Sequence, residues 1–334
     1  MSGFTSAPWW KRSPVNVRRL LGSLALAYFV FGFAPAAHAW GCKGHQVIAL
    51  IAERHLSAQA RAMVEQILAA APISPDLRRF CGMSGLDAFA DSATWADDER
   101  TVRPETYDWH FIDIPRGAPN ANLDQYCSPD GCVTKAILSE LALLRQPDAT
   151  PAQRGDALRF LIHFVGDLHQ PLHATTNDDE GGNCVPLTFF DQAPQETNPQ
   201  TESYRPNLHG IWDTDILERL AQGRTAQQMS AALEDQFEAR FAAWMAGPID
   251  VNGWAWESHE AAESVVYGKL PARIAVEPPM PVKTCADDNH IAQRMLSLNE
   301  TVGESYQSVA APMVEERLAL AGARLAAALN QLWP

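Results

Sequence analysis

Hydrophobic residues recur at helical spacing along most of the chain. Over residues 45–68 the apolar positions lie three and four apart, which predicts helix, with a second helix beginning at Ser57. The same spacing predicts helices over 133–144, 208–220, 226–245 and 314–332. The chain therefore favours an all-α fold.

A long central helix carries a clear start and a clear stop. Asp148-Ala-Thr-Pro151 is typical of a helix start, with proline in the first turn, and the pattern continues to about Gln170. Pro171 should end or kink this helix. We expect the break to move His173 away from the face that residues 163 and 167 share.

Strand patterns are few. Residues 185–190 follow Gly181-Gly182 and predict one arm of a short β-hairpin. Residues 191–206 are polar and rich in proline, and predict a loop. The pattern as a whole predicts a single helical domain with long functional loops and a short β-hairpin.

The first 39 residues are typical of a secretory signal. A basic stretch precedes an apolar run, and Ala37-His38-Ala39 fits a small-x-small cleavage site. Cleavage would leave a domain over 40–334 with Trp40 at its N-terminus, exported to the periplasm or secreted. No later segment is apolar enough to span a membrane, although a retained signal anchor is the alternative.

Acidic residues outnumber basic ones, 40 to 26, for a net charge of −14. The first 39 residues hold four of the basic residues and no acidic one, so their removal leaves −18. Such a chain has no basic field to hold polyanions in general. A phosphate-ester substrate would need positive charge from bound metal.

The chain contains six cysteines, a number that suits disulfide bonds in an oxidising compartment. Cys127 and Cys132 bracket a Pro-Asp-Gly turn, which predicts a bond between them. The other four cysteines allow three pairings. A cysteine zinc site is the alternative, but no second close pair of cysteines is present to support it.

Two histidine and aspartate spacings point to metal. They are His163-x3-Asp167-x5-His173 and His209-x3-Asp213. Residues four apart lie on one helix face, so each pair can converge on one ion. Imidazole with carboxylate suits zinc. One such pair alone is usually a solvated or capped helix face, but the joint pattern favours a zinc enzyme.

Further ligand types stand in the segments 95–100, 109–113 and 40–45, and the ordered pieces together carry a resemblance. The chain resembles the zinc-dependent single-strand nucleases of fungi and plants (the nuclease S-one/P-one type), which share a helical fold with bacterial zinc phospholipases C. The matching pieces follow the family's order: Trp40 with His45, Trp95-Ala-Asp97, His110-Phe-Ile-Asp113, the 163–173 stretch, Gly181-Gly-Asn183, Asn207-Leu-His209 and Trp212-Asp213-Thr214.

The resemblance implies three Zn2+ ions and a metal-activated water that hydrolyses phosphodiester bonds. The substrates would be single-stranded DNA and RNA, with 3′-nucleotides, and the products would carry 5′-phosphates. No stable protein partner is implied. The implied ligand sets are Asp97, His110, His163 and Asp167 for one ion, His173, His209 and Asp213 for a second, and His45, Asp167 and the free amine and carbonyl oxygen of Trp40 for a third, with Asp167 bridging.

The resemblance also assigns roles toward the substrate. Arg100 would stabilise charge in catalysis, beside the metal-binding Asp97 and Asp167, while Phe111 and Asp113 would stack on and hydrogen-bond a nucleobase. Asn183 would be a weaker substrate contact. The alternatives are structural: an ion-pair partner for Arg100, a core residue at position 111, a turn cap at 113 and a turn residue at 183. Residues 177–180 are polar where the family places an apolar partner for the base.

Two other functions remain open at this point. A zinc phospholipase C uses a similar N-terminal tryptophan and His-x3-Asp-x5-His stretch, but it typically has glutamate at the position of Asp213, and the acidic charge opposes membrane access. A zinc-binding or storage protein could keep the metal ligands without catalysis. The presence of Arg100, Phe111 and Asp113 argues against that reading.

Overall fold

The computed structural model describes residues 3, 40–82, 85–276, 284–286 and 290–334. The predicted secretory signal, apart from residue 3, lies outside these described residues. By its internal contacts the chain divides into Met1–Ala34 and Pro35–Pro334. Every helix and strand described below belongs to the second unit.

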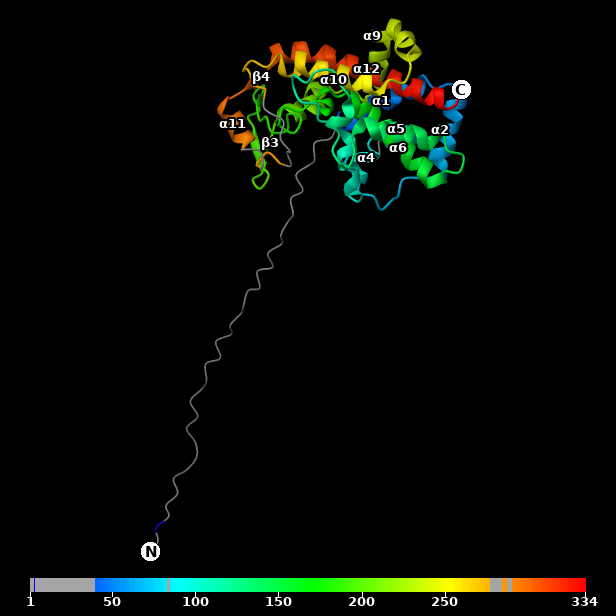
Figure 1. Cartoon of the computed structure of the whole chain (residues 1–334), viewed down its shortest axis with the longest axis horizontal. Helices are drawn as coiled ribbons and strands as arrows, with labels where there is room; N and C mark the ends of the chain where they lie inside the picture. Colours follow the sequence, from blue (N-terminus) through cyan, green and yellow to red (C-terminus); the bar gives the residue numbers. More distant parts are fainter. Residues whose placement is uncertain (1–2, 4–39, 83–84, 277–283, 287–289) are drawn as a thin grey trace. The chain divides into compact units, whose positions relative to one another are not determined.

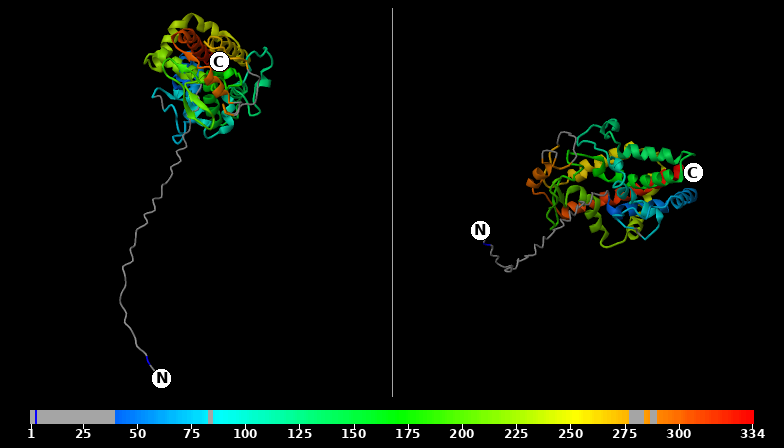
Figure 2. Two further views of the ribbon diagram at one scale, coloured as in Figure 1. Left: turned by 90° about the vertical axis from the view of Figure 1, so that its left-hand side faces the viewer. Right: turned by 90° about the horizontal axis from the view of Figure 1, so that it is seen from below.

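Long helices pack around a continuous apolar core (Figures 1 and 2). Helix α12 (Glu304–Leu332) packs against α1 (Gly41–Arg54), α9 (Ala226–Ala246) and α6 (Pro151–His169). Helix α6 in turn packs against α5 (Val133–Leu144) and α2 (Ala58–Ala70). Thus α1 and α6, which carry the predicted ligands, both lie against α12.

Close contact between α1 and α12 depends on a glycine. A Cβ at Gly322 would lie 2.5 Å from Cγ2 of Ile51 on α1. That separation is far below van der Waals contact, so any larger residue at position 322 would push the two helices apart. The small side chains along α12 therefore help to set the position of α1.

Three helix starts are where the sequence predicts them. Thr150 and Gln153 form a capping box at the start of α6, with Pro151 in its first turn. The side chain of Ser57 accepts a hydrogen bond from the amide of Ala60 at the start of α2. A second capping box, of Thr225 and Gln228, begins α9.

Short helical segments connect the long ones and supply much of the predicted site. Two of them, η4 and η5, are π-helical turns, and η1 to η3 are 3-10 turns. The short segments are α3 (Ala88–Ser92), α4 (Trp95–Glu99), η1 (Pro104–His110), η2 (Leu123–Tyr126), η3 (Pro171–Ala174), α7 (Leu208–Gly210), η4 (Ile211–Asp215), α8 (Ile216–Ala221), α10 (Val251–Ala261), η5 (Ala262–Tyr267) and α11 (Ile291–Ser297).

The strand predictions require correction. Strand β1 (Thr188–Phe189) pairs in parallel with β4 (Thr301–Val302), so residues 185–190 are not a hairpin arm. The hairpin is formed by β2 (Gln195–Asn198) and β3 (Ser203–Arg205), inside the segment predicted to be a loop. These two strands lack buried apolar side chains, so no hydrophobic alternation marks them.

The last helix begins earlier than predicted. It starts at Glu304 rather than at residue 314, with Pro312 inside it. Proline has no N–H for the helical ladder, which is why the pattern predicts a start beyond it. The buried side chains of Tyr306 and Ala310 extend the apolar face before Pro312 and compensate for the missing bond.

Three disulfide bonds join the cysteines. The predicted bond between Cys127 and Cys132 is confirmed, and the other two are Cys42–Cys81 and Cys184–Cys285. Among the described residues, no helix combines the length and the apolarity needed to cross a membrane.

Candidate metal centre

The predicted break in the central helix is confirmed. Helix α6 ends at His169, Gln170 leaves helical geometry with ψ of 118°, and a 3-10 turn begins at Pro171. The break places Asp167 and His173, only six residues apart in sequence, in two different groups of side chains.

The first group gathers residues from four elements. His45 comes from α1, Asp97 from α4, His110 from the end of η1, and His163 and Asp167 from α6. None is more than 2% exposed. The Nε2 atom of His163 lies 3.2 Å from Oδ2 of Asp167, 3.1 Å from Nδ1 of His110 and 3.8 Å from Oδ1 of Asp97. We call these five residues the five-residue cluster.

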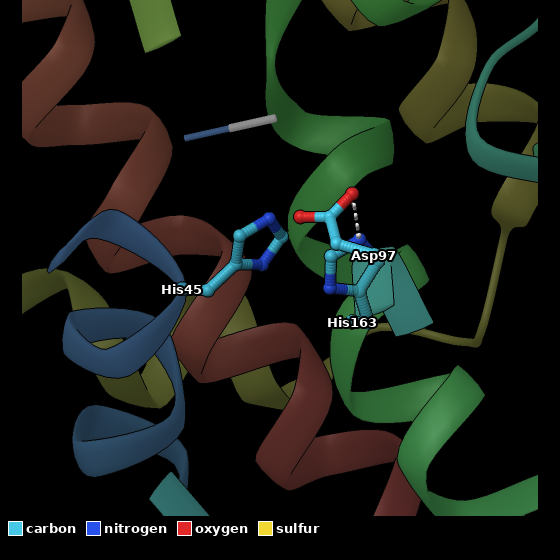
Figure 3. Close-up of side chains that lie close together, drawn as sticks. All are labelled: His45, Asp97 and His163. Atoms are coloured by element: carbon cyan, nitrogen blue, oxygen red, sulfur yellow. Dashed lines mark ion pairs between the residues drawn. The ribbon is translucent and has the colours of Figure 1, made fainter. Parts of the chain in front are cut away.

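Figure 3 shows how three of these side chains meet. His45 extends from α1 toward α6, and the imidazole of His163 and the carboxylate of Asp97 face it. The rings of His45 and His163 stack at 4.0 Å, and Nε2 of His45 lies 3.3 Å from Oδ1 of Asp167. A Cβ at Gly166 would lie 2.9 Å from Nδ1 of His45, so glycine at that position gives the ring its room.

The second group contains His173, His209 and Asp213, which we call the three-residue cluster. The Nε2 atoms of His173 and His209 are 3.2 Å apart, and Nε2 of His209 is 3.2 Å from Oδ2 of Asp213. The helix through 208–221 contains the π-helical turn η4, which ends just beyond Asp213. Such turns are frequent at functional sites because they redirect side chains.

Backbone carbonyl groups orient three of the histidines. The Nδ1 atoms of His163, His173 and His209 lie 2.7, 2.8 and 2.8 Å from the carbonyl oxygens of Ala93, His110 and Gly181, respectively. An Nδ1–H that donates to a carbonyl leaves the Nε2 lone pair available to an ion. In each case this Nε2 atom points into its cluster.

The polar atoms of both clusters fit a bound cation. His45 Nε2, Asp167 Oδ1 and Asp213 Oδ2 are buried and form no hydrogen bond to any residue that the structure describes. Buried polar atoms normally form hydrogen bonds, so these three atoms are available to a bound cation. Imidazole nitrogen and carboxylate oxygen are donors that zinc accepts.

Burial and nearby carboxylates shift the pKa values of the cluster histidines in opposite directions. Burial lowers the pKa of His45 and of His173, and lowers the pKa of His110 to about 4. Burial also opposes charge on His163, but the carboxylates of Asp167 and Asp97 outweigh it and raise the pKa of His163 to about 9. The two carboxylates therefore favour positive charge at this position.

Trp40 lies against the same part of α6. It is fully buried at the start of α1, and its indole Nε1 donates a hydrogen bond of 2.9 Å to the carbonyl oxygen of Gly166. The side-chain distances group His45 with Asp97 and His163 as well as with Asp167. The structure thus places the Trp40 side chain against the turn of α6 that carries Asp167, which lies beside His45.

The predicted substrate residues lie beside the five-residue cluster or beyond it. The guanidinium Nη2 of Arg100 is 3.5 Å from Oδ1 of Asp97, and Phe111, partly buried, directly follows His110. Asp113 is exposed. Partial desolvation by neighbouring groups, together with the charges of Asp108 and Asp179, raises the pKa of Asp113.

The turn that contains Asn183 is held by its own polar groups. The side-chain amide of Asn183 donates to the carbonyl oxygen of Glu180 at 2.9 Å, as a turn residue does. Asp179, fully buried, accepts hydrogen bonds from the Tyr267 hydroxyl at 2.8 Å and from the Gly182 amide at 3.0 Å. The Asp179 side chain thus has a structural role in the turn that contains Gly181, whose carbonyl oxygen orients His209.

Sequence reasoning missed one residue that contacts a predicted ligand. The side-chain amide of Gln170 donates a hydrogen bond of 2.6 Å to Oδ1 of Asp213. In the sequence, only the position of Gln170 between His169 and Pro171 indicates that it lies near the predicted ligands. His169, in the same stretch, joins neither cluster: its two ring nitrogens contact the Val165 carbonyl oxygen at 2.7 Å and the Arg324 guanidinium at 3.0 Å.

A third group of side chains has ligand types but cannot hold an ion. Glu180 lies near Cys184 and Cys285, but the two sulfurs form a disulfide bond and offer no thiolate. The His and Asp clusters are therefore the candidate metal sites of the described residues.

Comparison with known proteins agrees with this geometry. The chain is similar to nuclease P1 of Penicillium citrinum, 31% identical over 55% of this chain and 60% of that enzyme. It is similar to nuclease S1 of Aspergillus oryzae, 27% identical over 92% of this chain and 94% of the relative, and to endonuclease 2 of Arabidopsis thaliana, 27% identical over 90% and 92%. The family model described as S1/P1 Nuclease matches residues 40–334, and the chain therefore belongs to the S1/P1 nuclease family.

Proposed function

We propose that this protein is an exported, zinc-dependent endonuclease. It hydrolyses phosphodiester bonds in single-stranded DNA and RNA, and in 3′-nucleotides, and leaves 5′-phosphates. The observation that carries the proposal is the pair of buried His and Asp clusters with unsatisfied ligand atoms, in a member of a nuclease family. That membership does not favour a phospholipase C.

Three zinc ions would share the nine predicted ligands. When bound, they supply positive charge at the phosphate and a reactive water for attack on phosphorus. The first ion belongs to Asp97, His110, His163 and Asp167, the second to the three-residue cluster, and the third to His45, Asp167 and the Trp40 amine and carbonyl oxygen. Burial of the side chains supports these sets, because ligand groups that are already out of water bind an ion without losing hydration first.

Other side chains act on the substrate. Arg100, within 3.5 Å of Asp97, can offer its planar guanidinium to phosphoryl oxygens beside the five-residue cluster. Phe111 stacks on a base, and Asp113 hydrogen-bonds it. Stacking on an aromatic ring requires a base that is out of a duplex, which gives the preference for single strands. Asn183 would contribute a weaker contact at the Gly-Gly-Asn turn.

The test uses protein that begins at Trp40. Hydrolysis of single-stranded DNA, single-stranded RNA, a 3′-nucleotide and phosphatidylcholine is measured as purified, after zinc removal, and with zinc restored. We expect nucleic-acid cleavage with 5′-phosphate ends that is lost and regained with zinc. Lipid cleavage alone would assign a phospholipase C, and absence of all activity with zinc bound would assign a binding protein.

A matched pair of variants compares the loss of a cluster histidine with the loss of a histidine elsewhere. His163→Asn removes a fully buried member of the five-residue cluster, whereas His290→Asn removes a histidine whose side chain is 68% exposed. We expect activity and zinc content to fall only in the first variant. Equal activity in both variants would contradict the proposed role of the five-residue cluster.

A further inference from the structure

Tyr107 is an exposed aromatic side chain next to the proposed substrate residues. It lies on η1, three residues before His110, and the residue is 54% exposed, whereas Thr106 and His110 on the same element are buried. Among the large hydrophobic side chains that the structure describes as exposed, the aromatic ones are Tyr107 and Phe80. Exposure of a ring of this size costs hydrophobic stabilisation, and an exposed aromatic ring beside the site therefore favours a role in binding.

Tyr107 contacts Phe111 and Arg100, which both adjoin the five-residue cluster. Its ring meets that of Phe111 edge to face, with centroids 5.9 Å apart and planes at 81°. The Arg100 guanidinium carbon lies 5.7 Å from the Tyr107 ring centroid, and Arg100 itself reaches Asp97. A single side chain, Arg100, thus separates the Tyr107 ring from a proposed metal ligand.

Residues 177–180 offer no aromatic face to a second base. Residues 177–180 are Asn, Asp, Asp and Glu, and their polar groups hold the turn around Asp179 together. A nucleobase gains most from an aromatic face, which these residues lack.

We propose that Tyr107 and Phe111 form a two-base subsite, in which Tyr107 stacks on the base adjacent to the one held by Phe111. The inference rests on the proposed nuclease function and adds a second base to it. Because the two ring planes are nearly perpendicular, the two bases must splay apart. A duplex holds adjacent bases parallel and stacked, so this subsite accepts only an unpaired, unstacked strand.

The experiment compares substrates with one base and with several. Tyr107→Ala and Tyr107→Phe are assayed on a 3′-nucleotide, a single-stranded dinucleotide and a single-stranded oligonucleotide. We expect Tyr107→Ala to raise KM for the two longer substrates about fivefold or more, since base stacking contributes about 1–3 kcal/mol, a factor of about 5 to 150. KM for the 3′-nucleotide should change less than twofold, and Tyr107→Phe should behave as wild type.

Phe80→Ala is the matched control, because Phe80 is also exposed, at 39%, and also has an arginine, Arg78, 5.6 Å from its ring centroid. Its KM values should be unchanged. The inference is overturned if Tyr107→Ala leaves KM for the dinucleotide unchanged, or raises KM for the one-base substrate equally. Absence of wild-type cleavage would instead overturn the nuclease function, so the two failures are distinguishable.

Discussion

Gln170 holds Asp213 through a hydrogen bond of 2.6 Å between residues 43 apart in sequence. The bond occupies Oδ1 of Asp213, while Oδ2 faces His209 Nε2 at 3.2 Å. The side-chain oxygen of Gln170 accepts from the Leu172 amide at 2.5 Å, so the amide group cannot rotate without losing both bonds. Gln170 is therefore a positioning residue for the three-residue cluster.

Gln170→Met keeps the side-chain length and removes both bonds. We expect zinc affinity at the three-residue cluster to fall about 10- to 100-fold, the usual effect of losing such a partner. Competition with a zinc chelator measures it. Gln331→Met, at an exposed site on α12, is the control. Unchanged zinc affinity in a folded Gln170→Met protein would exclude the positioning role.

The proposed Trp40 ligand set depends on a free amine. Addition of two residues before Trp40 converts that amine to an amide, which cannot bind the third zinc. We expect about one ion less per chain and a large loss of activity relative to protein that begins at Trp40, measured by metal analysis and hydrolysis of single-stranded DNA. Full zinc content and activity with the extension in place would rule out Trp40 as a ligand.

The Cys42–Cys81 bond supports two parts of the five-residue cluster. Cys42 lies three residues before His45 on α1. Cys81 follows Phe80, whose amide donates to Asp98 Oδ1 at 2.7 Å, next to Asp97 on α4. Replacing both cysteines with serine should therefore weaken zinc binding as well as stability. Chelator competition and urea unfolding measure the two effects.

The Cys127–Cys132 bond serves as the control for removal of Cys42–Cys81. The sequence separations are 39 and 5 residues, so chain entropy predicts losses of about 4 and about 2 kcal/mol, respectively. Removal of the shorter-range bond should leave zinc affinity unchanged. Equal effects of both double variants on zinc affinity would contradict a special role for Cys42–Cys81.

Glu140 on α5 gives a prediction about pH. It is 7% exposed, and burial raises its pKa to about 7, with Arg103 opposing the shift and Asp156 adding to it. A carboxyl group whose pKa is higher in the folded state than in the unfolded state makes its full contribution to stability below the unfolded-state pKa, near 4.5. That contribution is lost as the pH rises through 7. Glu140→Gln should therefore be more stable than wild type at pH 8, by about 1–3 kcal/mol, and similar at pH 5.

Urea unfolding at both pH values, with excess zinc throughout, tests this. Both proteins have the same zinc ligands, so the pH dependence of those ligands cancels in the difference between their free energies of unfolding. Glu238→Gln, at an exposed position of α9, should show no such difference. A Glu140→Gln protein with the same pH dependence as wild type would show that Glu140 ionises normally.

The sequence predicts the long elements well because their signals are local. Apolar spacing locates α2, α5 and α9, and the caps at Thr150 and Thr225 set helix starts by hydrogen bonds within one turn. Pro171 likewise ends α6 through its own ring and missing N–H. None of these features needs knowledge of distant contacts.

Other features depend on partners far along the chain and are missed. The β2–β3 hairpin has no buried alternation, and the start of α12 before Pro312 depends on tertiary burial of Tyr306. The contact between Gln170 and Asp213 joins two segments whose approach no local pattern reveals. The edge-to-face arrangement of Tyr107 and Phe111 likewise requires coordinates.

The break at Pro171 has a consequence for protein engineering. The segment from His163 to His173 supplies side chains to both clusters, so the register between them is encoded in eleven consecutive residues rather than in the docking of separate domains. By contrast, Arg100, Tyr107, Phe111 and Asn183 lie on short helices and turns that border this segment. The proposed substrate-binding residues can therefore be redesigned, or can diverge in evolution, while the two clusters stay intact.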